Sequence, residues 1–69
     1  MSKDQFVEVL KANNMPASLE DGVVSVILVG GTAEDVKKAF VKCKLLAQKF
    51  GYKHSLRVRK MEEVYEGTI

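Results

Sequence analysis

The single cysteine and the single histidine are the side chains of this sequence best suited to catalysis or metal binding. A cysteine nucleophile needs a histidine within reach and an accessible, electropositive setting, and a structural zinc site needs four ligands with paired spacing. Cys43 falls on the apolar stripe of an expected helix, where a cysteine behaves as a small hydrophobic side chain. His54 begins an expected strand and has no partner motif. We therefore expect no catalytic residue, no metal site, no cofactor and no enzymatic activity.

The Gly30-Gly31-Thr32 turn before an expected helix is a candidate anion site, because the free amide groups of a helix N-terminus bind anions. The turn lacks the Gly-Lys-Ser/Thr sequence of a phosphate-binding loop and the spacing of a dinucleotide-binding turn. Glu34 and Asp35 follow it closely and would repel phosphate. The sequence therefore indicates a turn that ends a strand, with Thr32 as the cap of the next helix.

The distribution of charge along the chain is its most informative feature. Residues 37–60 contain nine basic residues and no acidic one, whereas the rest of the chain has two lysines and nine acidic residues. The small net charge of +2 therefore hides a strong segregation, and segregated charge indicates a partner of opposite charge. The residues expected to form a basic binding surface are Lys37, Lys38, Lys42, Lys49, Lys53, Arg57, Arg59 and Lys60.

Solvation of a helix explains only part of this basic segment. Lysines near a helix C-terminus complement the macrodipole, which accounts for Lys44 and Lys49. An ordinary exposed helix face would also contain glutamates that pair with lysines at i, i+4. We therefore expect a non-enzymatic binding module with a polyanionic partner, either nucleic acid or an acidic protein surface. No aromatic platform accompanies the arginines, and the chain has no helix-turn-helix, zinc-finger or ribonucleoprotein motif.

Exposed apolar side chains support a second hypothesis. Val41 and Leu45 lie more than a right angle away from the apolar stripe of the expected helix. Val23, Ile27 and Val29 lie on the second face of an expected strand whose two faces are both apolar. These five residues are a candidate apolar interface, and they favour an alternative function: a protein–protein interaction, inhibitor or assembly protein that acts as a homodimer.

Hydrophobic periodicity and turn residues define the elements that position these side chains. Asp21-Gly22 predicts a tight hairpin turn, and Gly51 ends the long helix. The expected helices span residues 3–13 and 33–50, and the expected strands span residues 17–20, 23–29 and 53–60. Residues 62–69 are expected to form a short edge strand or a frayed tail, with a strand over 64–68 favoured.

This order predicts a small α+β, two-layer sandwich of the form α-β-β-α-β(-β). A right-handed strand–helix–strand connection places both helices on one face of a three- or four-stranded sheet, either mixed or antiparallel. The strand over residues 53–60 pairs either in parallel with the strand over 23–29 or antiparallel with the strand over 17–20. Because both faces of residues 23–29 are apolar, we expect that strand to be central.

Length and composition restrict the class of protein further. A chain of 69 residues is long enough for one domain, residues 1–69, with a small core. One cysteine forms no internal disulfide, which indicates a reducing, cytoplasmic location. No apolar run is long enough for a bilayer, and the N-terminus does not resemble a signal peptide, so we expect no membrane partner. No motif in the chain resembles that of a known family.

Overall fold

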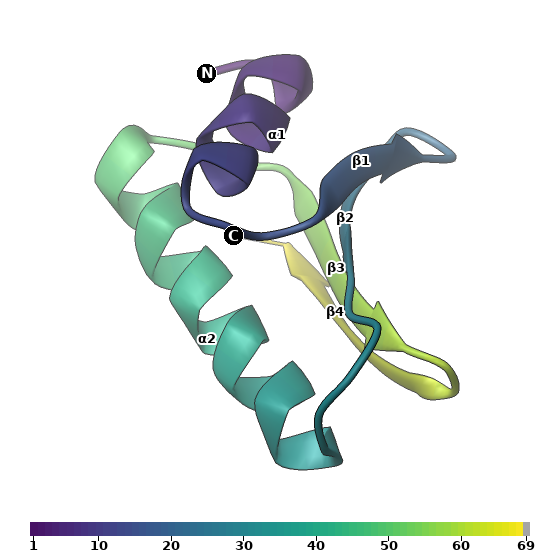
Figure 1. Cartoon of the computed structure of the whole chain (residues 1–69). Coiled ribbons are helices and arrows are strands. Elements are labelled where there is room, and N and C mark those ends of the chain that lie inside the picture. The colour runs from purple at the N-terminus through teal and green to yellow at the C-terminus, as the bar shows by residue number, and fades with distance from the viewer. Residues whose placement is uncertain (69) are drawn as a thin grey trace.

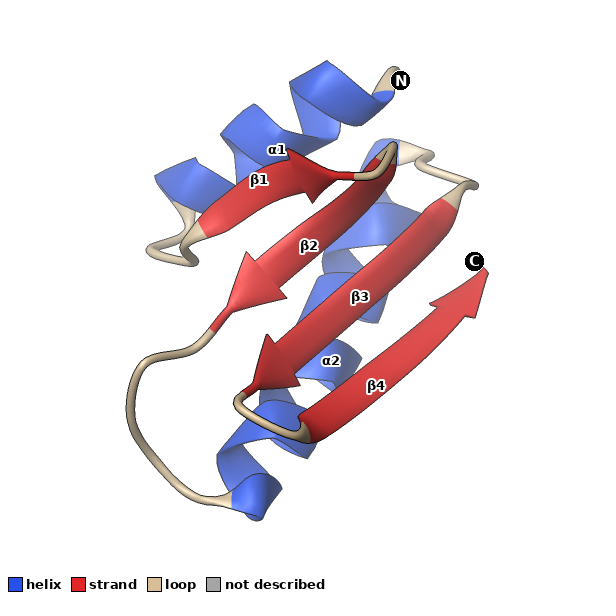
Figure 2. Cartoon of the chain, turned by 90° about the vertical axis from the view of Figure 1, so that its right-hand side faces the viewer, coloured by secondary structure: helices blue, strands red, loops and turns tan. Residues whose placement is uncertain are grey.

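The computed structural model describes residues 1–68 and shows two helices packed on one face of a four-stranded sheet (Figure 1, Figure 2). The sheet order is β1-β2-β3-β4, and Figure 2 looks onto the face that the helices leave uncovered. The predicted α+β sandwich is confirmed, with a mixed sheet and a central β2. The elements are α1 (Lys3–Ala12), β1 (Ala17–Glu20), β2 (Val23–Ile27), α2 (Ala33–Phe50), β3 (Ser55–Lys60) and β4 (Glu63–Thr68).

Helix α1 begins and ends through local hydrogen bonds that its sequence encodes. The Ser2 hydroxyl accepts from the backbone N–H of Gln5, and the Gln5 side chain accepts from the backbone N–H of Ser2. This reciprocal pair satisfies two amide groups that the first helical turn leaves free. At the other end Asn14 adopts a left-handed conformation with φ of 63°, which turns the chain toward β1.

Two tight hairpins and one parallel pairing build the sheet. Strands β1 and β2 pair antiparallel around Asp21-Gly22, and both turn residues have positive φ, as the sequence predicts. Strand β3 pairs in parallel with β2, with Val24 opposite Leu56, and antiparallel with β4. Strand β4 confirms the prediction of a final strand, whereas Ile69 lies outside the described residues.

Strands β2 and β3 are both shorter than their apolar patterns predict. Strand β2 ends at Ile27, whose N–H donates to the Pro16 carbonyl, and the Leu28 N–H makes one further bond to the Arg59 carbonyl of β3 before the chain leaves the sheet. Val29 therefore lies in the loop before α2 and is 97% exposed. Strand β3 begins at Ser55 and not at residue 53, because the chain is still turning where the Tyr52 hydroxyl donates to the Ser55 carbonyl.

The core lies between the sheet and the two helices. Tyr52 is fully buried, and its ring stacks on Phe6 of α1 at 4.2 Å between centroids. This stacking joins α1 to the segment that follows α2, and desolvation raises the pKa of Tyr52. Cys43 contacts Met15 with 3.2 Å between the two sulfur atoms. The other fully buried apolar side chains are Leu10, Val24, Val26, Val36, Ala47, Leu56 and Val58.

Candidate binding surface on helix α2

An open groove of about 290 Å³ lies on α2 and is lined by residues of this helix alone. Val41 and Leu45 form its apolar part and are 50% and 60% exposed. Lys37, Lys38 and Lys42 line the same groove. We call these five residues, together with Glu34 at the N-terminal end, the α2 groove. It combines exposed apolar area with positive charge on one helical element.

The geometry of α2 explains why these side chains face outward. Val36, Cys43 and Ala47 are buried on the stripe that faces the sheet, and at ~100° per residue Val41 and Leu45 fall on the opposite side. At the N-terminus the backbone N–H of Thr32 donates to Asp35 Oδ2 at 2.7 Å, so this carboxylate caps the helix. Glu34 is then the single carboxylate that lines the groove beside three lysines.

The eight basic residues predicted as the binding surface lie at several places on the molecule. Three of them, Lys37, Lys38 and Lys42, line the α2 groove. The others lie as follows: Lys49 in the last turn of α2, Lys53 in the loop after α2, Lys60 at the end of β3, and Arg57 and Arg59 within β3. The Lys49 ammonium lies 5.7 Å from the centroid of the Phe50 ring.

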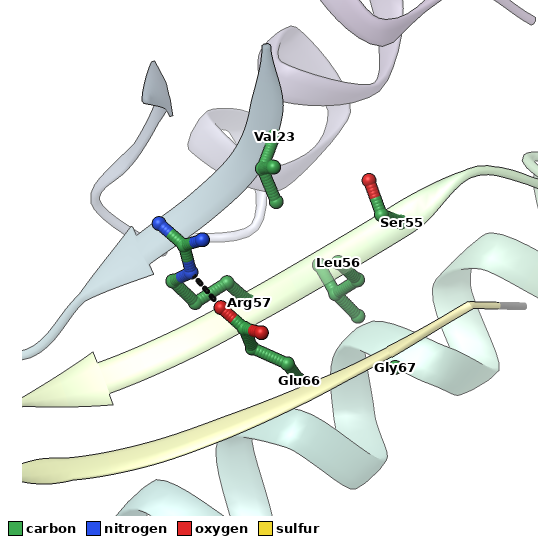
Figure 3. Close-up of a pocket in the computed structure, with 6 residues that line it drawn as sticks. All are labelled: Val23, Ser55, Leu56, Arg57, Glu66 and Gly67. Atoms are coloured by element: carbon green, nitrogen blue, oxygen red, sulfur yellow. Dashed lines mark hydrogen bonds and ion pairs between the residues drawn. The ribbon is translucent and has the colours of Figure 1, made fainter. Parts of the chain in front are cut away.

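Both arginines lie on the uncovered face of the sheet, and each is paired with a glutamate of the same chain. Arg57 donates to Glu66 of β4, as Figure 3 shows. Arg59 reaches across β2 to Glu20 of β1, with 3.0 Å between Nη2 and Oε2. Because the helices cover the other face of the sheet, these arginines are separated from the α2 groove by the sheet itself. The structure therefore does not unite α2 and β3 in one basic surface.

The paired side chains cover the middle of the open sheet face. Ser25 of β2 points to this face, since its neighbours in the register are Ser18 and Arg57, yet it is fully buried. Beside it lies an open hollow of about 300 Å³, which includes Val23, Arg57 and Glu66 in its lining (Figure 3). The two charged groups of the hollow bind each other, so a ligand there would have to compete with an existing ion pair.

The pairing of Glu20 with Arg59 makes a prediction about acid stability. The hydrogen bond from Arg59 lowers the pKa of Glu20 from its ordinary value of 4.5, and desolvation opposes this effect. A carboxylate with a lowered folded-state pKa contributes stability above its unfolded pKa and loses it as the pH falls through the folded pKa. In urea titrations from neutral to acidic pH, we expect Glu20→Gln to be less stable than the wild type at pH 7.

We expect this difference to diminish below the ordinary pKa of Glu20. Arg59→Gln and the double variant complete the thermodynamic cycle, in which the coupling between the two residues should also diminish toward acid. A stability difference that stays constant from neutral to acidic pH would contradict the assignment.

The five residues predicted as an apolar interface do not form one patch. Val41 and Leu45 lie together in the α2 groove. Val23 and Ile27 are half-buried on the open sheet face, and Val29 lies in the loop before α2. Only the first pair combines high exposure with neighbouring positive charge.

The two side chains considered for catalysis lie in different environments. Cys43 is fully buried, and desolvation raises the pKa of its thiol to about 11, which disfavours the nucleophilic thiolate. His54 is exposed and lies edge-on to the Tyr52 ring at 5.4 Å. Within residues 1–68, no three or more His, Cys, Asp or Glu side chains gather closely enough to hold a metal ion. Over the same residues, neither helix is long and apolar enough to cross a membrane.

Comparisons with protein families, curated proteins and solved structures gave no match to this chain.

Sequence reasoning missed the glutamates that pair with the arginines. A signal for Glu66 was present: a two-residue turn at Met61-Glu62 places Arg57 opposite Glu66, as the observed register does. Glu20 had no comparable signal. Its contact with Arg59 spans an intervening strand and depends on the strand order β1-β2-β3.

Proposed function

We propose that this chain is a non-enzymatic binding module that engages an acidic protein surface through the α2 groove. The single observation that supports the proposal is the combination, on one exposed helix face, of the apolar pair Val41/Leu45 with three lysines. Interfaces between proteins commonly have an apolar centre and a charged rim. The α2 groove has this arrangement on a small scale.

The partner that fits this chemistry presents apolar and acidic side chains together. An amphipathic helix with leucines and glutamates on one face would place its apolar residues against Val41 and Leu45. Its carboxylates would then lie close to Lys37, Lys38 and Lys42. The apolar contact would supply most of the affinity, whereas the lysines would accelerate encounter and set the orientation.

The structure favours a protein partner over nucleic acid for this surface. Phosphate recognition relies on cationic and polar groups. The exposed aliphatic pair between the lysines can neither neutralise a phosphate nor donate a hydrogen bond to it. The two arginines already have carboxylate partners on the opposite face of the sheet. The α2 groove also has no aromatic side chain on which a base could stack.

A titration monitored by nuclear magnetic resonance tests the proposal directly. The probe is a synthetic helical peptide with leucine and glutamate on one face, and a scrambled peptide of the same composition is the control. We expect the amphipathic peptide to shift amide signals around Lys37, Lys38, Val41, Lys42 and Leu45, with weaker binding at high salt. The scrambled peptide should shift them much less.

Duplex and single-stranded oligonucleotides form the second arm of the experiment. Nucleic-acid binding would appear as shifts with a steep linear dependence of log affinity on log salt concentration. Stronger binding of oligonucleotides than of the amphipathic peptide would overturn the proposal in favour of nucleic acid. No shift with any probe at low salt would remove the function assigned to the α2 groove.

A further inference from the structure

The tip of the β3–β4 hairpin has an unusual composition for a tight turn. Met61 and Glu62 connect the two strands, and Lys60 pairs with Glu63 across them. Met61 is 84% exposed and Val64 is exposed beside it. The tip therefore presents two apolar side chains together with the carboxylates of Glu62 and Glu63. We call residues 61–64 the hairpin tip.

The backbone of the hairpin tip is strained where its largest apolar side chain projects. Met61 has φ of 53°, a left-handed conformation that favours glycine, asparagine or aspartate. The equivalent position of the β1–β2 hairpin is Asp21, with φ of 52°, followed by Gly22. That turn has the residues that its conformation requires, whereas the β3–β4 turn has an exposed methionine. Strain of this kind at an exposed position is a reason to look for a binding role.

The hairpin tip and the α2 groove have complementary chemistry. The groove places Val41 and Leu45 among lysines, and the tip places Met61 and Val64 beside carboxylates. Among the described residues, Glu62 and Glu63 form no ion pair within 4.0 Å. Residues 61–66 contain three acidic residues and no basic one; Glu66 is already paired with Arg57, so Glu62 and Glu63 supply the acidic charge that the tip offers to a basic groove.

Within one molecule the two surfaces cannot meet. The turn between β3 and β4 lies at one end of the sheet (Figure 1). Val41 and Leu45 of the α2 groove lie on the side of the helix opposite to the buried residues that face the sheet. We infer that the hairpin tip of a second copy of this chain occupies the α2 groove. This inference rests on the proposed function, because it names the partner of the same groove.

The proposed contact joins two different surfaces, so every copy has one tip to offer and one groove to fill. Such a contact is heterologous unless a two-fold axis makes two copies exchange tips with each other. A two-fold axis gives a reciprocal dimer, whereas a heterologous contact gives a ring or a longer chain. In each case the contact weakens as salt screens the lysine–glutamate attraction.

Complementation between two defective variants tests the contact. The tip variant carries Met61→Gly and Glu62→Lys, and the groove variant carries Lys38→Glu and Leu45→Ser. In sedimentation velocity experiments, we expect the wild type to self-associate in a concentration- and salt-dependent manner. Each variant alone should self-associate with an affinity at least about tenfold lower than that of the wild type, since each has lost one of the two surfaces. An equimolar mixture should form a one-to-one complex, because an intact tip then meets an intact groove.

The Met61→Gly single variant separates association from folding. Glycine suits the positive φ of this position, so we expect this variant to be at least as stable as the wild type while associating more weakly. A wild type that stays monomeric at high concentration, or a mixture that fails to form the complex, would overturn the inference. If the amphipathic peptide still shifts the signals of the α2 groove in that case, the proposed function stands and only the identity of the partner is wrong.

Discussion

Replacing Tyr52 with alanine should unfold most of the protein or bring it to the edge of stability. Tyr52 is fully buried, stacks on Phe6 and donates a hydrogen bond of 2.7 Å to the Ser55 carbonyl. Removal of a large buried aromatic side chain costs about 3–5 kcal/mol. A domain of this size has a total free energy of unfolding of roughly 3–10 kcal/mol. We therefore expect Tyr52→Ala to lack a cooperative unfolding transition or to shift it strongly in urea, monitored by circular dichroism.

The Tyr52→Phe variant is the matched control. It keeps the ring on Phe6 and removes only the hydroxyl, so the loss should be about 1 kcal/mol, the net contribution of one hydrogen bond. Equal losses for the two variants would show that the hydrogen bond, and not the stacked ring, stabilises this joint between α1 and the end of α2. A Tyr52→Ala variant with wild-type stability would contradict the packing described for the core.

Reversing two charges of the α2 groove should greatly reduce binding of the acidic amphipathic peptide. An exposed ion pair contributes ~0.2–1 kcal/mol, and reversal replaces each attraction with a repulsion, so Lys38→Glu/Lys42→Glu should raise Kd by about tenfold or more at low salt. The difference from the wild type should shrink as salt is added, because the charges are exposed. Fluorescence anisotropy of a labelled peptide measures both effects.

A second pair of reversals controls for net charge. Lys11→Glu/Lys53→Glu changes the net charge by the same amount, but Lys11 lies on α1 and Lys53 in the loop after α2. We expect this control to bind the peptide nearly as well as the wild type. Equal loss in both double variants would mean that the peptide responds to overall charge and not to the groove. The Val41→Ser/Leu45→Ser variant completes the set, and unchanged affinity in that variant would exclude an apolar contribution.

Most of the fold was predictable because short-range chemistry determines it. The Asp21-Gly22 turn and the Gly51 helix end each act over a few residues, and each has the predicted role in the structure. The end of β2 was not predictable in this way. Leu28 and Val29 are as apolar as the residues before them, yet the strand stops at Ile27, just beyond the last residue that pairs with β1.

The candidate binding surface was only partly predictable, because charge along a sequence does not show which face a side chain occupies. Helical periodicity correctly placed Val41 and Leu45 away from the core. The run of basic residues continues from α2 into β3, but helix and strand lie in different layers. Because side chains along β3 alternate between the two sheet faces, Arg57 and Arg59 lie on the uncovered face. There they pair with glutamates from two other strands.

Each helix of this protein packs on its own hairpin, α1 on β1 and β2, and α2 on β3 and β4. The two halves are continuous segments of the chain, and one parallel pairing, β2 with β3, joins their strands. Hairpins form in about 1–10 μs, whereas this pairing must close a loop that contains all of α2, with a larger entropic cost. We therefore expect the pairing of β2 with β3 to be a late event of folding.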